Sequence, residues 1–183
     1  MRSMGDIPAG QETEEIPSDM IYKSALRILA ATAIGDPDPL TRRHALYLLG
    51  MAGDPACIGV CGQALRDPEK AVRDQATRNL SGFGEQASGL LINLLGDPDW
   101  KVRYRAVEAL GAMKDGKAGK TLTSVLRDEK DHVRYMAAKA LGQIQYHPAI
   151  PGLEVCLHDE NRYVRKMAAE ALFQIIHSSP SDS

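Results

Sequence analysis

Acidic, basic and aromatic side chains crowd into one short segment of this sequence, "GDPDWKVRYRAVEALGAM" at residues 96–113. A carboxylate beside a guanidinium and a tyrosine hydroxyl can hold or transfer a proton, and a basic–aromatic cluster can bind an anionic group. The segment is therefore a candidate catalytic or binding site. The rest of the chain has to separate that role from an architectural one.

Most of these polar residues belong to an internal repeat. Five aspartates stand 30 or 31 residues apart, and each is followed by arginine six residues later, alanine nine later and leucine thirteen later. The aspartates are Asp36, Asp67, Asp97, Asp128 and Asp159, and the arginines are Arg42, Arg73, Arg103, Arg134 and Arg165. An active site needs one acid and one base rather than five of each, so we interpret both columns as structural. Such an arginine can bridge backbone carbonyls or the aspartate of an adjacent repeat, and no catalytic residue is predicted.

Each repeat is expected to form two helices. Apolar residues from Val102 to Met113 follow helical spacing, and the Asp-Pro pair in front predicts an N-cap and a preset helix entry. Glycines at 50, 111 and 142 predict the end of this first helix, which we call helix A. A shorter apolar pattern predicts a second helix, B, after it. A helix at about 18–34 is expected to stand in for B at the N-terminal end, and the last repeat stops after its A helix.

The repeats resemble HEAT-like repeats of the kind named for phycobilin lyase subunits, which run D-x-x-x-x-V-R-x-x-A-x-x-A-L-G. Four of the five copies carry the valine, at Val72, Val102, Val133 and Val164, and the first has Thr41. This resemblance covers about residues 20–176 and implies an all-α fold, a right-handed α-solenoid of about five stacked helix pairs. We expect a repeat domain over 18–177, with repeats from about 36, 67, 97, 128 and 159, between disordered tails at 1–17 and 178–183.

The composition argues against several classes of function. The net charge of −2 gives no overall attraction to nucleic acid or to acidic membranes. No apolar run approaches the roughly 20 residues needed to span a bilayer, and the N-terminus has no signal pattern. Three cysteines, an odd number, argue against a secreted disulfide framework. We therefore expect a soluble cytoplasmic protein without membrane or nucleic-acid partners.

The cysteines and histidines do not predict a metal or cofactor site. Cys57 and Cys61 stand one helical turn apart, but in the repeat alignment they and Cys156 occupy columns of alanine, leucine and valine. We interpret all three as small buried hydrophobic residues. Deoxyhypusine hydroxylases, a related HEAT-like family, bind a di-iron centre through His-Glu dipeptides. None of the five histidines here is followed by glutamate, so no metal or cofactor is predicted.

Three aromatic residues depart from the repeat columns and form the first candidate binding site. Trp100 is the only tryptophan, and Tyr104 follows it by one helical turn and shares a column with Tyr135. Tryptophan and tyrosine are favoured anchors at protein interfaces, so the three predict an aromatic patch on the A helices. The alternative is that Trp100 only covers the start of a helix in the neighbouring repeat.

A polar, mildly basic strip along the B helices forms the second candidate. By resemblance the B helices line the concave face of the solenoid, and glycines at 59, 62, 89 and 119 are expected to keep that groove open. The strip consists of Gln63, Arg66, Asn93, Lys120, Ser124, Arg127 and His158. It suits an extended or acidic segment of another protein, although such a strip can also be an ordinary solvated helix face.

The leading hypothesis is a non-catalytic protein-interaction scaffold. Stacked repeats bury one continuous core and present a long rigid surface, so binding costs little ordering entropy. The alternative, implied only by the resemblance, is a bilin lyase-like subunit or a chaperone of a cofactor protein. Nucleic-acid binding ranks third because of the near-neutral charge. Weak self-association through an exposed end of the solenoid is also expected.

Overall fold

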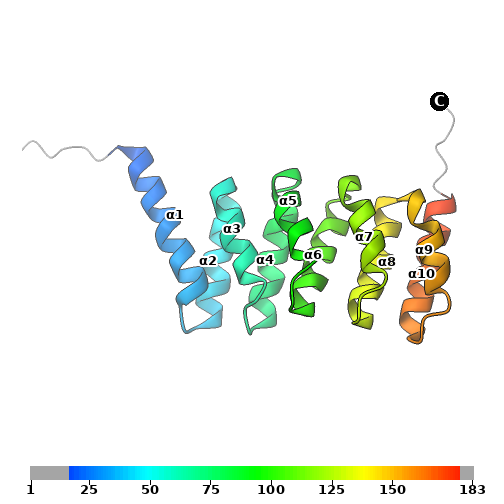
Figure 1. The fold of residues 1–183 in the computed structure, drawn as a ribbon. Helices are drawn as coiled ribbons and strands as arrows, with labels where there is room; N and C mark the ends of the chain where they lie inside the picture. The colour runs from blue at the N-terminus through cyan, green and yellow to red at the C-terminus, as the bar shows by residue number, and fades with distance from the viewer. Residues whose placement is uncertain (1–16, 178–183) are drawn as a thin grey trace, which may run out of the picture.

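The computed structural model describes residues 17–177, and every element assigned within them is a helix (Figure 1). The A helices are α2 (Pro39–Ala52), α4 (Lys70–Gly82), α6 (Trp100–Ala112), α8 (Asp131–Ile144) and α10 (Arg162–His177). The B helices are α3 (Ile58–Ala64), α5 (Glu85–Leu94), α7 (Gly119–Val125) and α9 (Ile150–Cys156), and α1 (Ser18–Gly35) stands in the B position before the first repeat. Short 3-10 turns precede three B helices: η1 (Pro55–Cys57), η2 (Gly116–Ala118) and η3 (His147–Ala149). Apart from Pro17, the tails expected at 1–17 and 178–183 lie outside the described residues.

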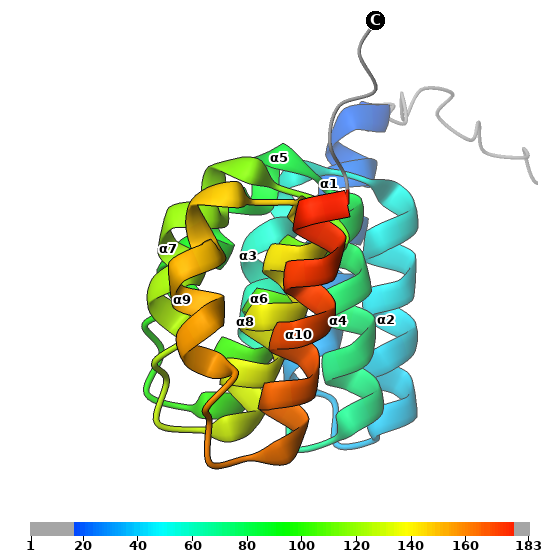
Figure 2. The same ribbon diagram turned by 90° about the vertical axis from the view of Figure 1, so that its right-hand side faces the viewer.

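The helices form two layers, as the repeat predicts. Figure 1 shows the helix pairs stacked in chain order along one direction. In the end-on view of Figure 2 the A helices lie in one layer and α3, α5, α7 and α9 in the other. Each A helix packs on the A helix of the next repeat, so the contacts along the stack are all between neighbours. This arrangement is an α-solenoid.

The alanine and leucine columns build the core between the two layers. The column alanines are at most 3% exposed in all five repeats, and Leu49, Leu80, Leu110 and Leu141 are fully buried. The small alanines let the helices approach, and the leucines fill the space between the layers. The last leucine of the column, Leu172, is only half-buried because no B helix follows α10 in the described residues.

Three repeated glycines lie inside the A helices, so the helix end predicted at them was wrong. Gly50, Gly111 and Gly142 face the next A helix. A Cβ at Gly111 would lie 2.8 Å from the Cβ of Ala140, and one at Gly142 would lie 3.0 Å from the Cα of Ala171. Glycine allows close helix packing here and does not form a C-cap. A glycine near the end of a helical pattern fits both roles, so the sequence does not distinguish them. Helix α2 instead ends at Gly53, where φ is 64°.

The repeated aspartates stand two residues before the N-caps, which corrects a second prediction. Asp38 caps α2 by accepting the N–H groups of Leu40 and Thr41, and Asp99 caps α6 by accepting the N–H of Lys101. Asp36 instead accepts the N–H of Asp38 at 2.9 Å. The difference arises because the residue after the proline is extended, which places the helix start two positions later. The repeated aspartate therefore shapes the turn and leaves its second oxygen for another partner.

Candidate functional site

The repeated arginine of one helix pair binds the repeated aspartate of the next. Arg103 donates from Nε and Nη2 to the two carboxylate oxygens of Asp128, at 2.7 and 2.8 Å. Its Nη1 donates to the carbonyl oxygen of Asp97, at 2.8 Å. We call each such arginine–aspartate connection a rung and the whole series the ladder. The rungs of this form are Arg42–Asp67, Arg103–Asp128 and Arg134–Asp159.

These three rungs are buried ion pairs. The side chains of Arg103 and Asp128 are 10% and 9% exposed. Burial raises the pKa of Asp128 and is the largest single influence on it. The hydrogen bonds and charge of Arg103, the N–H of Lys130 and the charge of Arg134 together outweigh burial and hold that pKa below its ordinary value of 3.8. The pKa values of Asp67 and Asp159 are lowered in the same way by Arg42 and Arg134, again against burial. The rungs consequently hold charge that is not available to a ligand.

The rung between α4 and α6 is connected differently. Arg73 donates from Nη1 to the carbonyl oxygens of Asp67 and Pro68, both at 2.6 Å, but it does not reach Asp97. Arg66, at the end of the preceding B helix, binds Asp97 instead. Arg66 was predicted to be part of the basic strip, and the structure places its guanidinium in the ladder.

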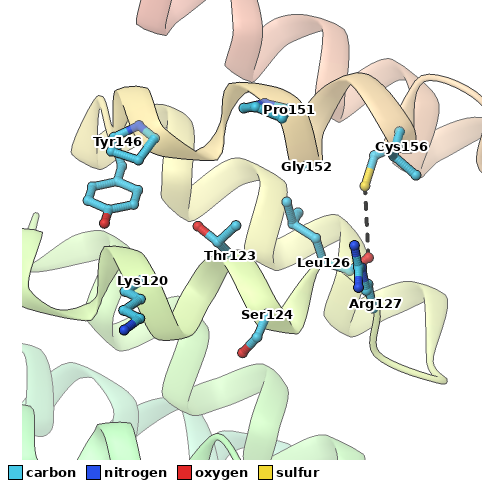
Figure 3. Close-up of a pocket in the computed structure, with 11 residues that line it drawn as sticks. Lys120, Thr123, Ser124, Leu126, Arg127, Tyr146, Pro151, Gly152 and Cys156 are labelled. Carbon is cyan, nitrogen blue, oxygen red and sulfur yellow. Dashed lines mark hydrogen bonds between the residues drawn. The ribbon is translucent and has the colours of Figure 1, made fainter.

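A groove of about 590 Å³ opens on the B-helix face between α7 and α9 (Figure 3). Lys120, Ser124 and Arg127 line it from the α7 side. The opposite side is largely apolar and comes from η3, α9 and the residue before η3: Tyr146, Pro148, Pro151, Gly152, Val155 and Cys156. Lys120 and Arg127 are exposed, and neither forms an ion pair with any described residue. The groove thus combines an apolar wall with two uncompensated positive charges.

The groove gathers three of the seven residues predicted for the basic strip. Gln63, Asn93 and His158 are exposed but lie outside it. The sequence reasoning missed Tyr146, Pro148 and Pro151. A signal for them existed in "YHPAIPG", because no other B helix begins with two prolines.

The glycines of the B helices have two different roles. Gly59 and Gly89 have open space around them, as expected of a groove. Gly62 packs against Leu90, and a Cβ at Gly119 would collide with the ring of Tyr146. The prediction that all four keep a groove open was therefore wrong for Gly62 and Gly119, because these two make room for a side chain of the next repeat.

The three aromatic residues lie on the A-helix face but in two hollows. Trp100 and Tyr104 line a hollow of about 230 Å³ together with His132. Tyr135 lines a second hollow, of about 470 Å³, in which His132 also takes part. The ring of His132 lies 5.5 Å from that of Trp100, measured between centroids, so it stands between the two hollows. His132 and the exposed Tyr163 were not predicted as members of this surface.

The cysteines are buried and free, as predicted. Cys57, Cys61 and Cys156 are at most 5% exposed and form no disulfide. Burial raises the pKa of the Cys61 thiol to about 11, so this thiol stays protonated. Among residues 17–177 no cluster of histidine, cysteine, aspartate and glutamate is arranged to hold a metal ion. In the same part of the chain, no helix has the length and apolar character needed to cross a membrane.

The two-layered stack, its buried ladder and its long open faces define a class of protein, the helical repeat proteins. The family model for HEAT repeats matches residues 26–89 and 87–173. The chain belongs to the HEAT repeat family. No curated protein sequence matches it.

Several solved structures share the fold. The complex of CpcE and CpcF of phycocyanin lyase from Nostoc sp. PCC7120 matches with a TM-score of 0.62 and 24% identity, over 96% of this chain and 71% of that one. Human deoxyhypusine hydroxylase matches with a TM-score of 0.52 and 21% identity, over 85% and 75% of the two chains. A designed armadillo repeat protein in complex with the peptide (KR)4 matches with a TM-score of 0.51 and 19% identity, over 88% and 95%. At these identities the likeness concerns the fold.

Proposed function

We propose that this protein is a non-catalytic interaction scaffold that binds an extended, acidic segment of a partner protein in the groove between α7 and α9. The observation that carries the proposal is the pairing of an apolar wall with two unpaired cations in one groove. Val155 is 66% exposed, so an apolar side chain is held open to solvent where a partner could cover it. Lys120 and Arg127 lie on the facing side of the same groove.

The shape of the groove favours an extended segment. Its two sides come from successive B helices, and further B helices continue the same layer toward the N-terminus (Figure 2). A chain laid across this layer would meet one helix after another, as peptide ligands do on repeat surfaces. The repeat frame is rigid, so little entropy is lost in ordering it on binding.

The sign of the charge selects the ligand. The designed armadillo neighbour is bound to a peptide of lysine and arginine. The α7 side of this groove carries Lys120 and Arg127, so a ligand with glutamate or aspartate complements its charge and a basic peptide does not. A ligand of alternating acidic and apolar residues would contact both the basic α7 side and the apolar side of the groove, since neighbouring side chains of an extended strand point to opposite sides.

A fluorescence-anisotropy titration with labelled peptides tests the proposal. A short peptide of alternating glutamate and leucine is the probe, and one of alternating lysine and leucine is its charge control. We expect the acidic peptide to bind and the double variant Lys120→Glu/Arg127→Glu to weaken binding at least tenfold. Lys139→Glu, at an exposed lysine on α8, reverses one charge away from the groove, half the charge change of the double variant, and should leave binding unchanged. Equal binding of the two peptides, or no effect of the double variant, would contradict the proposal.

A bilin lyase-like role is the alternative, and its support is the match to the CpcE–CpcF complex over 96% of this chain. Under this alternative the protein would bind a linear tetrapyrrole or the protein that carries it. An absorbance titration with a bilin separates the two candidates. A saturable spectral shift would favour the lyase-like role, and an unchanged spectrum would favour the scaffold. The cytoplasmic location and the limits of the repeat domain stay predictions.

Self-association through the ends of the stack also has a specific observation in its favour. Asp36 has no ladder arginine, and Arg165 donates only to the carbonyl oxygens of Asp159 and Glu160 among the described residues. A second copy placed end to end would bring Arg165 of one chain to Asp36 of the other and so form a further rung. The contact would be weak, because Leu48 and Phe173 are exposed and replace the small residues at which successive A helices meet within one chain.

Charge exchange tests this end-to-end contact. Light scattering over a range of concentrations should show a rise in mass for the wild type. Arg165→Asp should abolish the rise, and the double variant Arg165→Asp/Asp36→Arg should restore it. A strictly monomeric wild type at high concentration would contradict the contact.

A further inference from the structure

We call the contact between two successive A helices a joint. The joint between α4 and α6 is more open than the other joints of the A-helix layer. Ser81 stands at the position that is Gly50, Gly111 and Gly142 in the repeats where the helices approach closely. A hollow of about 510 Å³ lies between α4 and α6 and is lined in part by Ser81, and the 230 Å³ hollow that contains Trp100 adjoins the start of α6. Polar side chains at this joint are thus accessible from the A-helix face.

The altered rung leaves the guanidinium of Arg73 largely unused. Because Arg66 occupies Asp97, the Nε and Nη2 groups of Arg73 have no hydrogen-bond partner among the described residues. In the three regular rungs the same two groups bind a carboxylate, for example Asp128. Arg73 lines the smaller hollow beside Trp100 and Tyr104.

The charges around this hollow favour an anion. Lys101 is exposed, makes no ion pair with a described residue and lines the hollow with Arg73. The other basic side chains there already have acidic partners: Lys70 and Arg105 bind Asp74, and His132 contacts Asp131. No carboxylate lines the hollow itself. Arg73 and Lys101 therefore face the hollow, and neither forms an ion pair with a described residue.

We propose that Arg73 binds a carboxylate supplied by the aspartate or glutamate side chain of a partner protein, with Trp100 packed against the ligand. The protein itself shows that this arginine column binds a carboxylate through both Nε and Nη2, at 2.7 and 2.8 Å in the Arg103–Asp128 rung. At Arg73 the carboxylate comes from outside the chain. Lys101 adds a second charge, and the indole of Trp100 supplies apolar contact area for the aliphatic part of the ligand side chain.

This site is independent of the groove between α7 and α9. Its lining residues belong to α4, α6 and α8 of the A-helix layer, whereas the groove lies between α7 and α9 of the B-helix layer. Figure 2 shows the two layers. It also explains why the only tryptophan of the chain stands at the one internal rung whose arginine does not bind the next aspartate. The two surfaces can be tested by different variants and different signals.

The fluorescence of Trp100 reports on the hollow directly, because the chain has one tryptophan. The probe is an acetylated and amidated triglutamate peptide, which offers side-chain carboxylates only, and the control is the matching triglutamine peptide. We expect a saturable change in emission with triglutamate and none with triglutamine. Arg73→Gln should weaken the response at least tenfold. Arg73→Lys should weaken it less, because lysine keeps the positive charge but lacks the two parallel N–H donors of the guanidinium.

Two further variants separate this site from its surroundings. Arg43→Gln removes an exposed arginine from α2 and should leave the response unchanged. Arg127→Glu disables the proposed groove and should also leave it unchanged. The proposal is overturned if the wild type gives no saturable change, if both Arg73 variants respond like the wild type, or if inorganic phosphate competes as well as the peptide. Circular dichroism of each variant checks that the helices remain.

Discussion

The joints α6–α8 and α4–α6 use the same repeated positions and connect them differently. At α6–α8, Arg103 binds Asp128, and Gly111 lets the helices meet. At α4–α6, Arg66 takes the aspartate, Ser81 replaces the glycine, and a hollow opens beside Arg73. At α6–α8 the charges of Arg103 and Asp128 pair inside the stack. At α4–α6 the guanidinium of Arg73 lines a hollow and binds no carboxylate of the described residues.

The difference teaches that a repeated residue does not guarantee a repeated contact. Arg73 and Arg103 stand at the same distance from the Asp-Pro pair of their own repeats, and both bind the carbonyl oxygens of that pair. What separates them is a competitor, since Arg66 reaches Asp97 and no residue plays that part for Asp128. Arg127 stands in the same column as Arg66, yet Arg134 still binds Asp159, so the exchange of partners is particular to the α4–α6 joint.

The largest expected effect is the loss of a closed rung. Arg103→Met removes the partner of Asp128 and leaves that carboxylate buried without a counter-charge, which we expect to destabilise the protein by about 3–5 kcal/mol. Arg73→Met breaks only two hydrogen bonds to carbonyl oxygens and should cost about 1–2 kcal/mol. Urea unfolding followed by circular dichroism measures both. Equal losses for the two variants would remove the distinction between the joints.

The second-largest expected effect on stability comes from substitutions at the helix contacts of the two joints. Gly111→Ala places a Cβ against the Cα and Cβ of Ala140 and should destabilise the protein by about 1–3 kcal/mol. Ser81→Ala at the equivalent position of the open joint should change stability by less than about 0.5 kcal/mol. The same urea titration applies. A tolerated alanine at position 111 would show that the α6–α8 joint is as open as the other.

A double-mutant cycle tests the competition for Asp97. In Arg66→Ala the carboxylate is released, and Arg73 can take the position that Arg103 has in its own rung. Arg66→Ala/Arg73→Met should therefore destabilise the protein by about 1 kcal/mol more than the sum of the single variants. Strict additivity would mean that Arg73 cannot reach Asp97 even when it is free.

Acid sensitivity gives the smallest effect for any one carboxyl group. The pKa values of Asp67, Asp128 and Asp159 are lower in the folded chain than their usual value, so their stabilisation is present above about pH 4 and is lost as pH falls through the folded pKa values. Arg103→Met should make the decline of the free energy of unfolding below pH 4 shallower. Arg73→Met should change the slope less, because Arg73 lowers the pKa of Asp67 through its charge only and Asp67 keeps its hydrogen bonds from Arg42. An equal change in both slopes would contradict the altered rung.

The sequence predicted the frame well and the surfaces in part. Columns of alanine and leucine gave the two layers, and the columns of aspartate and arginine marked where successive repeats meet. Trp100 and Tyr104 were found because they break their columns. Tyr146, Pro148 and Pro151 were missed because the B helices were compared for polar residues only. The roles of Gly50, Gly111 and Gly142 were misread, since close packing and helix ends both favour glycine.

By itself the sequence determined a stack of repeated helix pairs, because each short repeat can bury its apolar face only against its neighbours, and the resemblance to HEAT-like repeats implied the α-solenoid. It also determined that the aspartates and arginines belong mainly to the frame. Only the tertiary structure decided which arginine binds which aspartate. Arg66 and Arg73 are both candidate partners of Asp97 in the sequence, and the choice between them depends on side-chain distances between helices that the one-dimensional pattern does not contain. For the same reason, the open fork at Arg73 and the groove between α7 and α9 emerge only once the helices are placed.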